Sequence, residues 1–137
     1  MILADTSAWV EYDRASGTAV HHRMVQLIES DERRLSITEP VMMEVLAGAR
    51  DNRRELDLRR LLLGFPLLRF DTAADFDAAV RIDRRCRSVG ITPRGMIDCL
   101  IAAVAWRHGA SVLAQDGDLI HVCRVIGIQL DQASART

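Results

Sequence analysis

The sequence contains no lysine, and all 18 of its basic residues are arginines. This absence excludes mechanisms that need a lysine as a nucleophile or as a phosphate ligand. Aromatic residues make up only 4% of the chain, which argues against a domain that binds single strands mainly by base stacking. The formal net charge of -1 excludes the strongly basic surface of a general nucleic-acid binder. Any contact with nucleic acid must therefore be local.

Cysteines and long apolar runs are also scarce. Cys86, Cys99 and Cys123 are scattered and form no CxxC pair, so we interpret them as small buried apolar side chains. No stretch approaches the roughly 18 apolar residues that span a bilayer, and the first residues lack the pattern of a signal peptide. We expect a cytoplasmic protein that makes no contact with a membrane.

The overall composition is that of a globular domain. Hydrophobic residues make up 49% and charged residues 27% of the 137 residues. This length suits one hydrophobic core, and the chain contains no repeat, low-complexity segment or linker. We therefore expect a single domain over residues 1–137.

Short apolar runs alternate with amphipathic stretches along the chain. The runs predict strands at residues 1–4, 35–38, 67–70, 111–114 and 128–130. Apolar residues at helical spacing predict helices over 18–30, 40–49, 52–63, 72–90 and 96–108, with further helices after Asp5 and after Asp116. This order predicts an α/β fold with a mainly parallel sheet of four to five strands between helices. Ligands bind such sheets at the C-terminal ends of the strands.

Four acidic residues occupy positions that this fold would bring together. Asp5 and Asp116 each follow a predicted strand, so both lie at the binding edge of the sheet. Asp98 lies in the first turn of an apolar helix, where the helix dipole favours an ionised carboxylate. Glu44 lies on an otherwise apolar helix face, where an ionised acid is seldom found without a partner.

Carboxylates gathered in this way repel one another unless positive charge lies among them. A divalent cation supplies that charge, and ligation by oxygen alone favours Mg²⁺ or Mn²⁺ over zinc. Two such ions roughly 3.5–4 Å apart can activate a water and stabilise the leaving oxygen in phosphodiester cleavage. Single aspartates are usually helix caps or solvated charges. The joint placement of the four acids favours a metal site.

The segments that carry these acids resemble the PIN-domain nucleases, and in particular the VapC toxins of bacterial toxin–antitoxin pairs. The resemblance rests on ILADTSAWVEY, ITEPVMMEVLAGAR and IDCLIAAVAWRHGASVLAQDGDL, and it covers nearly the whole chain. It implies a three-layer α/β/α sandwich with magnesium- or manganese-dependent endoribonuclease activity on RNA. It also implies a cognate VapB-type antitoxin as partner and, often, a homodimer.

The resemblance also implies roles for individual residues. The implied catalytic and metal-binding acids are Asp5, Glu44, Asp98 and Asp116, with Glu44 ligating through water or only the second ion. The hydroxyl of Thr6 or Ser7 is implied to support the first acid, and Asp118 to be an auxiliary acid. Two positions depart from the family pattern: Ile97 stands where an Asn is frequent, and Leu119 where a Phe is frequent. The first departure weakens the expected support of the neighbouring ligand.

Arginines cluster on two of the predicted helices, over residues 50–60 and 81–87. We interpret them as solvated helix faces that pair with nearby acids such as Asp57 and Asp83, in preference to RNA contacts. Arg94 immediately precedes the helix of Asp98, which makes it the better candidate for binding a substrate phosphate.

Two other functions compete with a nuclease. An α/β phosphatase or signalling domain also gathers aspartates and magnesium at the strand ends, but such proteins hold the phosphoryl group with a lysine, which this chain lacks. The second is an inactive PIN-fold binding or assembly module that keeps a structural metal site. The presence of all four acids favours activity over this alternative.

Overall fold

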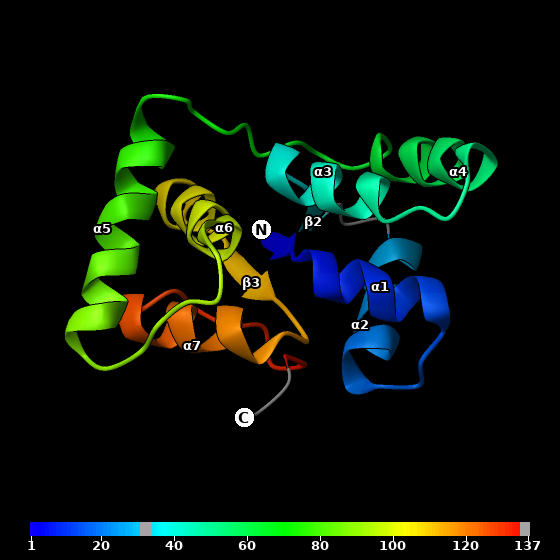
Figure 1. The fold of residues 1–137 in the computed structure, drawn as a ribbon. Coiled ribbons are helices and arrows are strands. Elements are labelled where there is room, and N and C mark those ends of the chain that lie inside the picture. Colours follow the sequence, from blue (N-terminus) through cyan, green and yellow to red (C-terminus); the bar gives the residue numbers. More distant parts are fainter. Residues whose placement is uncertain (31–33, 135–137) are drawn as a thin grey trace.

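The computed structural model describes residues 1–30 and 34–134. Helices connect the strands over this part of the chain (Figure 1), and the elements follow the predicted order except that no strand separates the helices between Glu39 and His108. The elements are β1 (Ile2–Ala4), α1 (Thr6–Arg14), α2 (Ala19–Glu29), β2 (Leu35–Ser36), α3 (Glu39–Ala47), α4 (Asn52–Leu62), α5 (Ala74–Ser88), α6 (Met96–His108), β3 (Ser111–Leu113) and α7 (Gly117–Ile126).

The sheet is parallel, with the strand order β2-β1-β3. Its central strand β1 is buried throughout, as expected for a sheet covered on both faces. In the view of Figure 1, α1 to α4 lie on one side of this strand and α5 to α7 on the other. The predicted α/β class with a parallel sheet between helices is therefore confirmed.

The two outermost predicted strands contribute only single bridges among the described residues. Leu67 pairs with Ile37 at one edge of the sheet, and Leu130 pairs with Val112 at the other. Pro66 has no N–H to extend the first pairing. At the other edge the chain turns away after Leu130, because the Asp131 carboxylate accepts a hydrogen bond from the N–H of residue 133. In place of the expected sheet of four to five strands, the described residues form a three-stranded sheet with one bridge at each edge.

Helix α6 forms the centre of the core. Residues 101–105 are at most 1% exposed, and α6 packs against both α5 and α7. A helix that is surrounded in this way is apolar on most of its circumference, which explains the wide apolar arc in its sequence. Because the core fixes α6, the first turn of this helix is held in place beside the sheet.

Each of the two strand-end acids also starts a helix. The Asp5 carboxylate accepts a hydrogen bond from the Ser7 N–H at the start of α1, and Asp116 accepts one from the Asp118 N–H at the start of α7. Side-chain caps of this kind satisfy N–H groups that the helix leaves unpaired. The caps fix where both acids stand at the C-terminal edge of the sheet.

None of the helices in the described ranges is long and apolar enough to cross a membrane.

Candidate active site

All four predicted acids line one hollow at the C-terminal edge of the sheet. Its volume is about 360 Å³, and we call it the acidic hollow, defined by Asp5, Glu44, Asp98 and Asp116. The acids come from four separate places: the end of β1, the middle of α3, the first turn of α6 and the end of β3. The tertiary structure therefore assembles carboxylates that lie far apart in the sequence.

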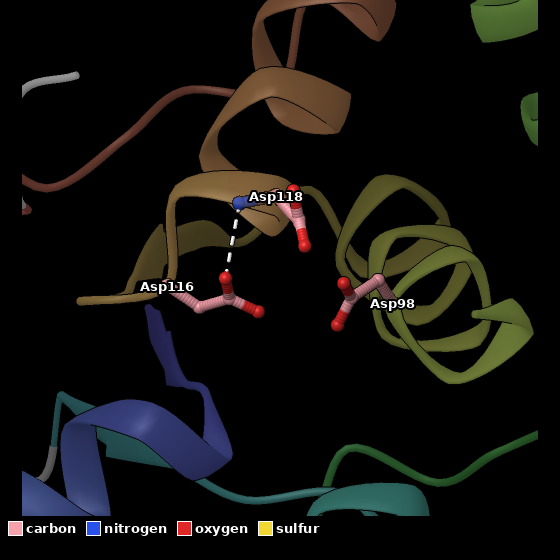
Figure 2. Close-up of side chains that lie close together, drawn as sticks. All are labelled: Asp98, Asp116 and Asp118. Atoms are coloured by element: carbon pink, nitrogen blue, oxygen red, sulfur yellow. Dashed lines mark hydrogen bonds between the residues drawn. The ribbon is translucent and has the colours of Figure 1, made fainter. Parts of the chain in front are cut away.

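Two acids of this hollow, Asp98 and Asp116, form a compact group with Asp118. Asp98, Asp116 and Asp118 each offer a carboxylate oxygen, and these atoms all lie within 4.8 Å of one another. Figure 2 shows Asp98 on α6 facing the two aspartates at the start of α7, where the Asp118 N–H donates to the Asp116 carboxylate over 3.0 Å. Asp118, expected as an auxiliary acid, thus belongs to the closest cluster.

Asp5 is the most buried of the four acids, at 2% exposed. Its Oδ2 accepts hydrogen bonds from the Ser7 N–H over 3.2 Å and from the Ser7 hydroxyl over 2.7 Å. Its Oδ1 is also buried, and no described residue donates a hydrogen bond to it. A buried carboxylate oxygen without a partner is costly, so this atom points to a ligand that supplies positive charge.

Two adjacent hydroxyls hold the acids, and they have different partners. The Ser7 hydroxyl donates to Asp5 and accepts hydrogen bonds from the N–H groups of Gln115 and Asp116, over 2.9 and 3.1 Å. The Thr6 hydroxyl instead donates to Glu44 Oε1 over 2.6 Å. Of the two hydroxyls proposed to support the first acid, Ser7 is the one that contacts it.

The environment raises the pKa of two of the acids. Burial raises the pKa of Asp5 to about 6, although the hydrogen bonds from Ser7 and the Thr6 backbone oppose the shift. Burial also raises the pKa of Asp98 to about 7, and the negative charges of the neighbouring carboxylates add to this shift. The cluster therefore resists full ionisation by itself.

These residues fit a divalent cation. The donor set consists of carboxylate oxygens, the ligands that Mg²⁺ and Mn²⁺ prefer. Asp5 Oδ1 lacks a hydrogen-bond donor among the described residues, and burial together with the neighbouring negative charges raises the pKa of Asp98. A cation would relieve both conditions, because it would supply a partner for the oxygen and stabilise the ionised carboxylates.

Arg94 lies at the rim of the cluster. Its Nε lies 2.8 Å from Asp118 Oδ2, while 86% of its side chain is exposed. An exposed ion pair of this kind is weak, so the guanidinium remains available to another anion. The position is compatible with the predicted contact to a substrate phosphate.

Two further polar residues of the acidic hollow, Glu11 and Gln115, were not predicted from the sequence. Glu11 follows Ser7 by four residues on α1, so helical spacing places both on the same face. That spacing was a signal that could have identified it. Gln115 adjoins Asp116 and had no comparable signal, because a residue in a turn can point in several directions.

Comparison with known proteins finds a matching family and similar sequences. The PIN domain family profile matches residues 2–125 of the chain. The chain is 44% identical over 129 residues to Ribonuclease VapC11 of Mycobacterium tuberculosis, with 94% of this chain and 96% of that protein covered.

Solved structures share the fold at low sequence identity. VapBC2 from Rickettsia felis, bound to a DNA fragment from the promoter, matches with a TM-score of 0.73 and 17% identity over 96% of this chain and 98% of that chain. VapC20 from Mycobacterium tuberculosis, described as a Sarcin-Ricin loop cleaving toxin, matches with a TM-score of 0.65 and 19% identity over 88% of this chain and 93% of that chain.

Proposed function

Because the chain belongs to the PIN-domain family, we propose that it is a metal-dependent endoribonuclease that acts as the toxin of a toxin–antitoxin pair. The relative that is 44% identical to it is a ribonuclease. One structural observation supports the proposal most strongly. Carboxylates from four separate elements line one hollow, and a buried oxygen of Asp5 there has no hydrogen-bond donor among the described residues.

The proposed cofactor is Mg²⁺ or Mn²⁺, held by Asp5, Asp98 and Asp116, with Asp118 beside them. Glu44 is the conditional ligand, because the Thr6 hydroxyl already occupies one of its oxygens. When bound, the cation would supply the charge that attracts an RNA phosphate and the Lewis acidity that phosphodiester hydrolysis requires.

The chain's own residues orient the site. The Ser7 hydroxyl ties Asp5 to the backbone that precedes Asp116, so two acids from different strands keep a fixed separation. The half-buried Asp98 lies in the first turn of α6, and the core holds this helix through its buried residues 101–105. Ligands held by such contacts lose little entropy on binding the cation and the substrate phosphate. This rigidity favours a catalytic site over a cluster of surface acids.

Cleavage of RNA by Asp98→Asn tests the proposal. We expect magnesium-dependent cleavage by the wild-type chain that is lost in this variant and in excess EDTA. Asp77→Asn on α5 is the matched control, because it makes the same chemical change at an exposed ion pair outside the acidic hollow. Cleavage by Asp98→Asn at the wild-type rate, or activity that persists in EDTA, would refute the proposal.

The proposed partner is a VapB-type antitoxin. VapBC complexes are among the solved structures with this fold, and the acidic hollow suits an arginine that the antitoxin inserts between the carboxylates. We expect the product of a small adjacent gene to bind this protein and inhibit its activity, and the lack of such an inhibitor would count against a toxin role. Light scattering of the purified chain tests the accompanying proposal of a homodimer.

The alternative function is an inactive binding module, and it is not favoured. It would bind Mg²⁺ and be stabilised by it, yet cleave no RNA. The wild-type chain distinguishes the two functions, because the thermal shift on adding Mg²⁺ and the cleavage assay are separate measurements. A thermal shift without cleavage of any cellular RNA would favour the binding module.

A further inference from the structure

A second hollow adjoins the acidic hollow and carries arginines. Its volume is about 420 Å³, and the two share Thr6, Val10 and Glu44 in their walls. Because they adjoin at these residues, we treat the two hollows as one groove, which leads away from the carboxylates along α1, α3 and α4. We call its outer part the arginine hollow, and the residues that define it are Trp9, Asp13, Arg14, Arg50 and Arg54.

The charges of the arginine hollow are only partly neutralised. Arg54 is engaged in an ion pair with Asp13. Arg50 lies 3.8 Å from Asp51, but 85% and 57% of these side chains are exposed, so the pair is weak. Arg14, which is exposed at the end of α1, forms no ion pair within residues 1–30 and 34–134. Two guanidinium groups thus remain available to an anionic ligand.

Most arginines of α4 and α5 outside the arginine hollow form ion pairs within their own helix. Arg53, Arg59, Arg81 and Arg87 each pair with an acid four residues away on the same helix. These pairs match the interpretation of the two clusters as solvated helix faces. Arg14 and Arg50 stand out because they line a groove that is continuous with the candidate active site.

We propose that the arginine hollow binds the RNA strand on one side of the cut, with Arg14 and Arg50 contacting backbone phosphates next to the scissile one. This inference rests on the proposed ribonuclease function. A strand whose phosphate lies at the carboxylates must leave through an adjoining channel, and this groove begins at Glu44 and Thr6. The planar guanidinium matches the oxygens of a phosphate.

Trp9 contributes a further polar group, its indole N–H, to the wall of the groove. Trp9 is 2% exposed and lines the arginine hollow, and its Nε1–H has no acceptor among the described residues. Buried indole N–H groups usually have a partner.

A nucleic-acid strand fits the groove better than an acidic peptide does. The strand carries a phosphate at every residue, so it presents anions both to a cation held by the acids and to the arginines. An acidic peptide would need its carboxylates at matching positions to do the same. A peptide of the antitoxin is the competing occupant that the experiment must separate.

Salt-dependent binding of single-stranded RNA tests the inference. Binding is measured in the Asp98→Asn background, where cleavage is expected to stop, with and without Arg14→Ala/Arg50→Ala. Each lost phosphate contact should reduce the slope of log K against log salt by about 0.7, so the double variant should lose about 1.4. In the active background the same two substitutions should raise KM and leave kcat nearly unchanged. Arg54 is left in place because its ion pair has a structural role.

Arg84→Ala/Arg85→Ala is the matched control, because it removes the same charge from exposed positions of α5, on the other side of the molecule (Figure 1). This control should keep the wild-type slope and KM. Arg14→Lys/Arg50→Lys should restore most of the slope, which excludes a folding defect as the cause.

Equal slopes for the groove variant and the control variant would overturn the inference, even if the wild-type chain cleaves RNA. Unchanged RNA binding together with lost inhibition by an antitoxin would also overturn it, because the groove would then belong to the protein partner. Failure of the wild-type chain to cleave RNA is a separate result and concerns the proposed function.

Discussion

Removal of the Ser7 hydroxyl is the most informative single change in this structure. Ser7→Ala deletes one oxygen atom, but that atom makes three hydrogen bonds, to the carboxylate of Asp5 and to the N–H groups of Gln115 and Asp116. The helix cap from the Ser7 N–H to Asp5 remains. The substitution therefore disconnects α1 from the end of β3 without removing an acid.

The magnitude follows from these contacts. The hydrogen bond to the ionised carboxylate contributes about 1.5–3 kcal/mol, and each backbone N–H left without an acceptor costs about 1–3 kcal/mol. Because the hydroxyl is only part-buried, water can replace some of the lost contacts. We expect the free energy of unfolding to fall by about 2–4 kcal/mol. Loss of a group that orients a metal ligand typically lowers metal affinity by about 10–100-fold.

Two measurements check these values. Urea denaturation in EDTA gives the free energy of unfolding, and titration calorimetry gives the affinity for Mg²⁺. Ser88→Ala is the control, because that exposed hydroxyl donates only to the carbonyl of Arg85 and lies outside the acidic hollow. A loss below about 0.5 kcal/mol together with wild-type magnesium affinity in Ser7→Ala would refute the reasoning.

Three further predictions concern other contacts. Burial alone would raise the pKa of Asp75, but hydrogen bonds from Arg107 and the backbone lower this pKa in the folded protein. The ionised Asp75 therefore stabilises the fold above its unfolded pKa of about 4, and this contribution is lost as the pH falls through the folded pKa. Asp75→Asn should therefore lower the free energy of unfolding at pH 7. The loss should be limited to about 1–3 kcal/mol, because Arg107 is partly exposed to solvent. Urea titrations below pH 4 should show a smaller difference between this variant and the wild-type chain. Thr6→Val deletes only the hydrogen bond to Glu44, so the free energy of unfolding should change by less than about 1.5 kcal/mol. The affinity for Mg²⁺, measured by calorimetry, should fall; an unchanged affinity would show that this hydrogen bond does not orient a metal ligand. Gly109→Ala should cost about 1 kcal/mol in thermal unfolding, because its φ of +66° strains a side-chain-bearing residue although the space is open; a neutral result would contradict the strain argument.

The local pattern of the sequence was sufficient to predict most of the elements. Apolar spacing identified the helices within a few residues of their observed ends, and the short apolar runs identified all three strands, because periodicity depends on which face of each element is buried. The acids after β1 and β3 were predicted at the edge of the sheet for the same reason. The outer strands at 67–70 and 128–130 were overestimated, since apolar composition does not reveal whether a neighbouring strand offers a continuous edge.

What the sequence by itself determined is the order of the helices and of the three strands, together with the positions of Asp5, Asp98 and Asp116 at element ends, which local spacing and capping dictate. Only the tertiary structure decided that Thr6 holds Glu44, that Ser7 joins Asp5 to the backbone before Asp116, and that Arg14 and Arg50 line one groove. The hydrogen-bonded pairs are separated by 38 and 108 residues in the chain. Contacts at such separations depend on how the helices pack around the sheet, and no local pattern encodes that packing.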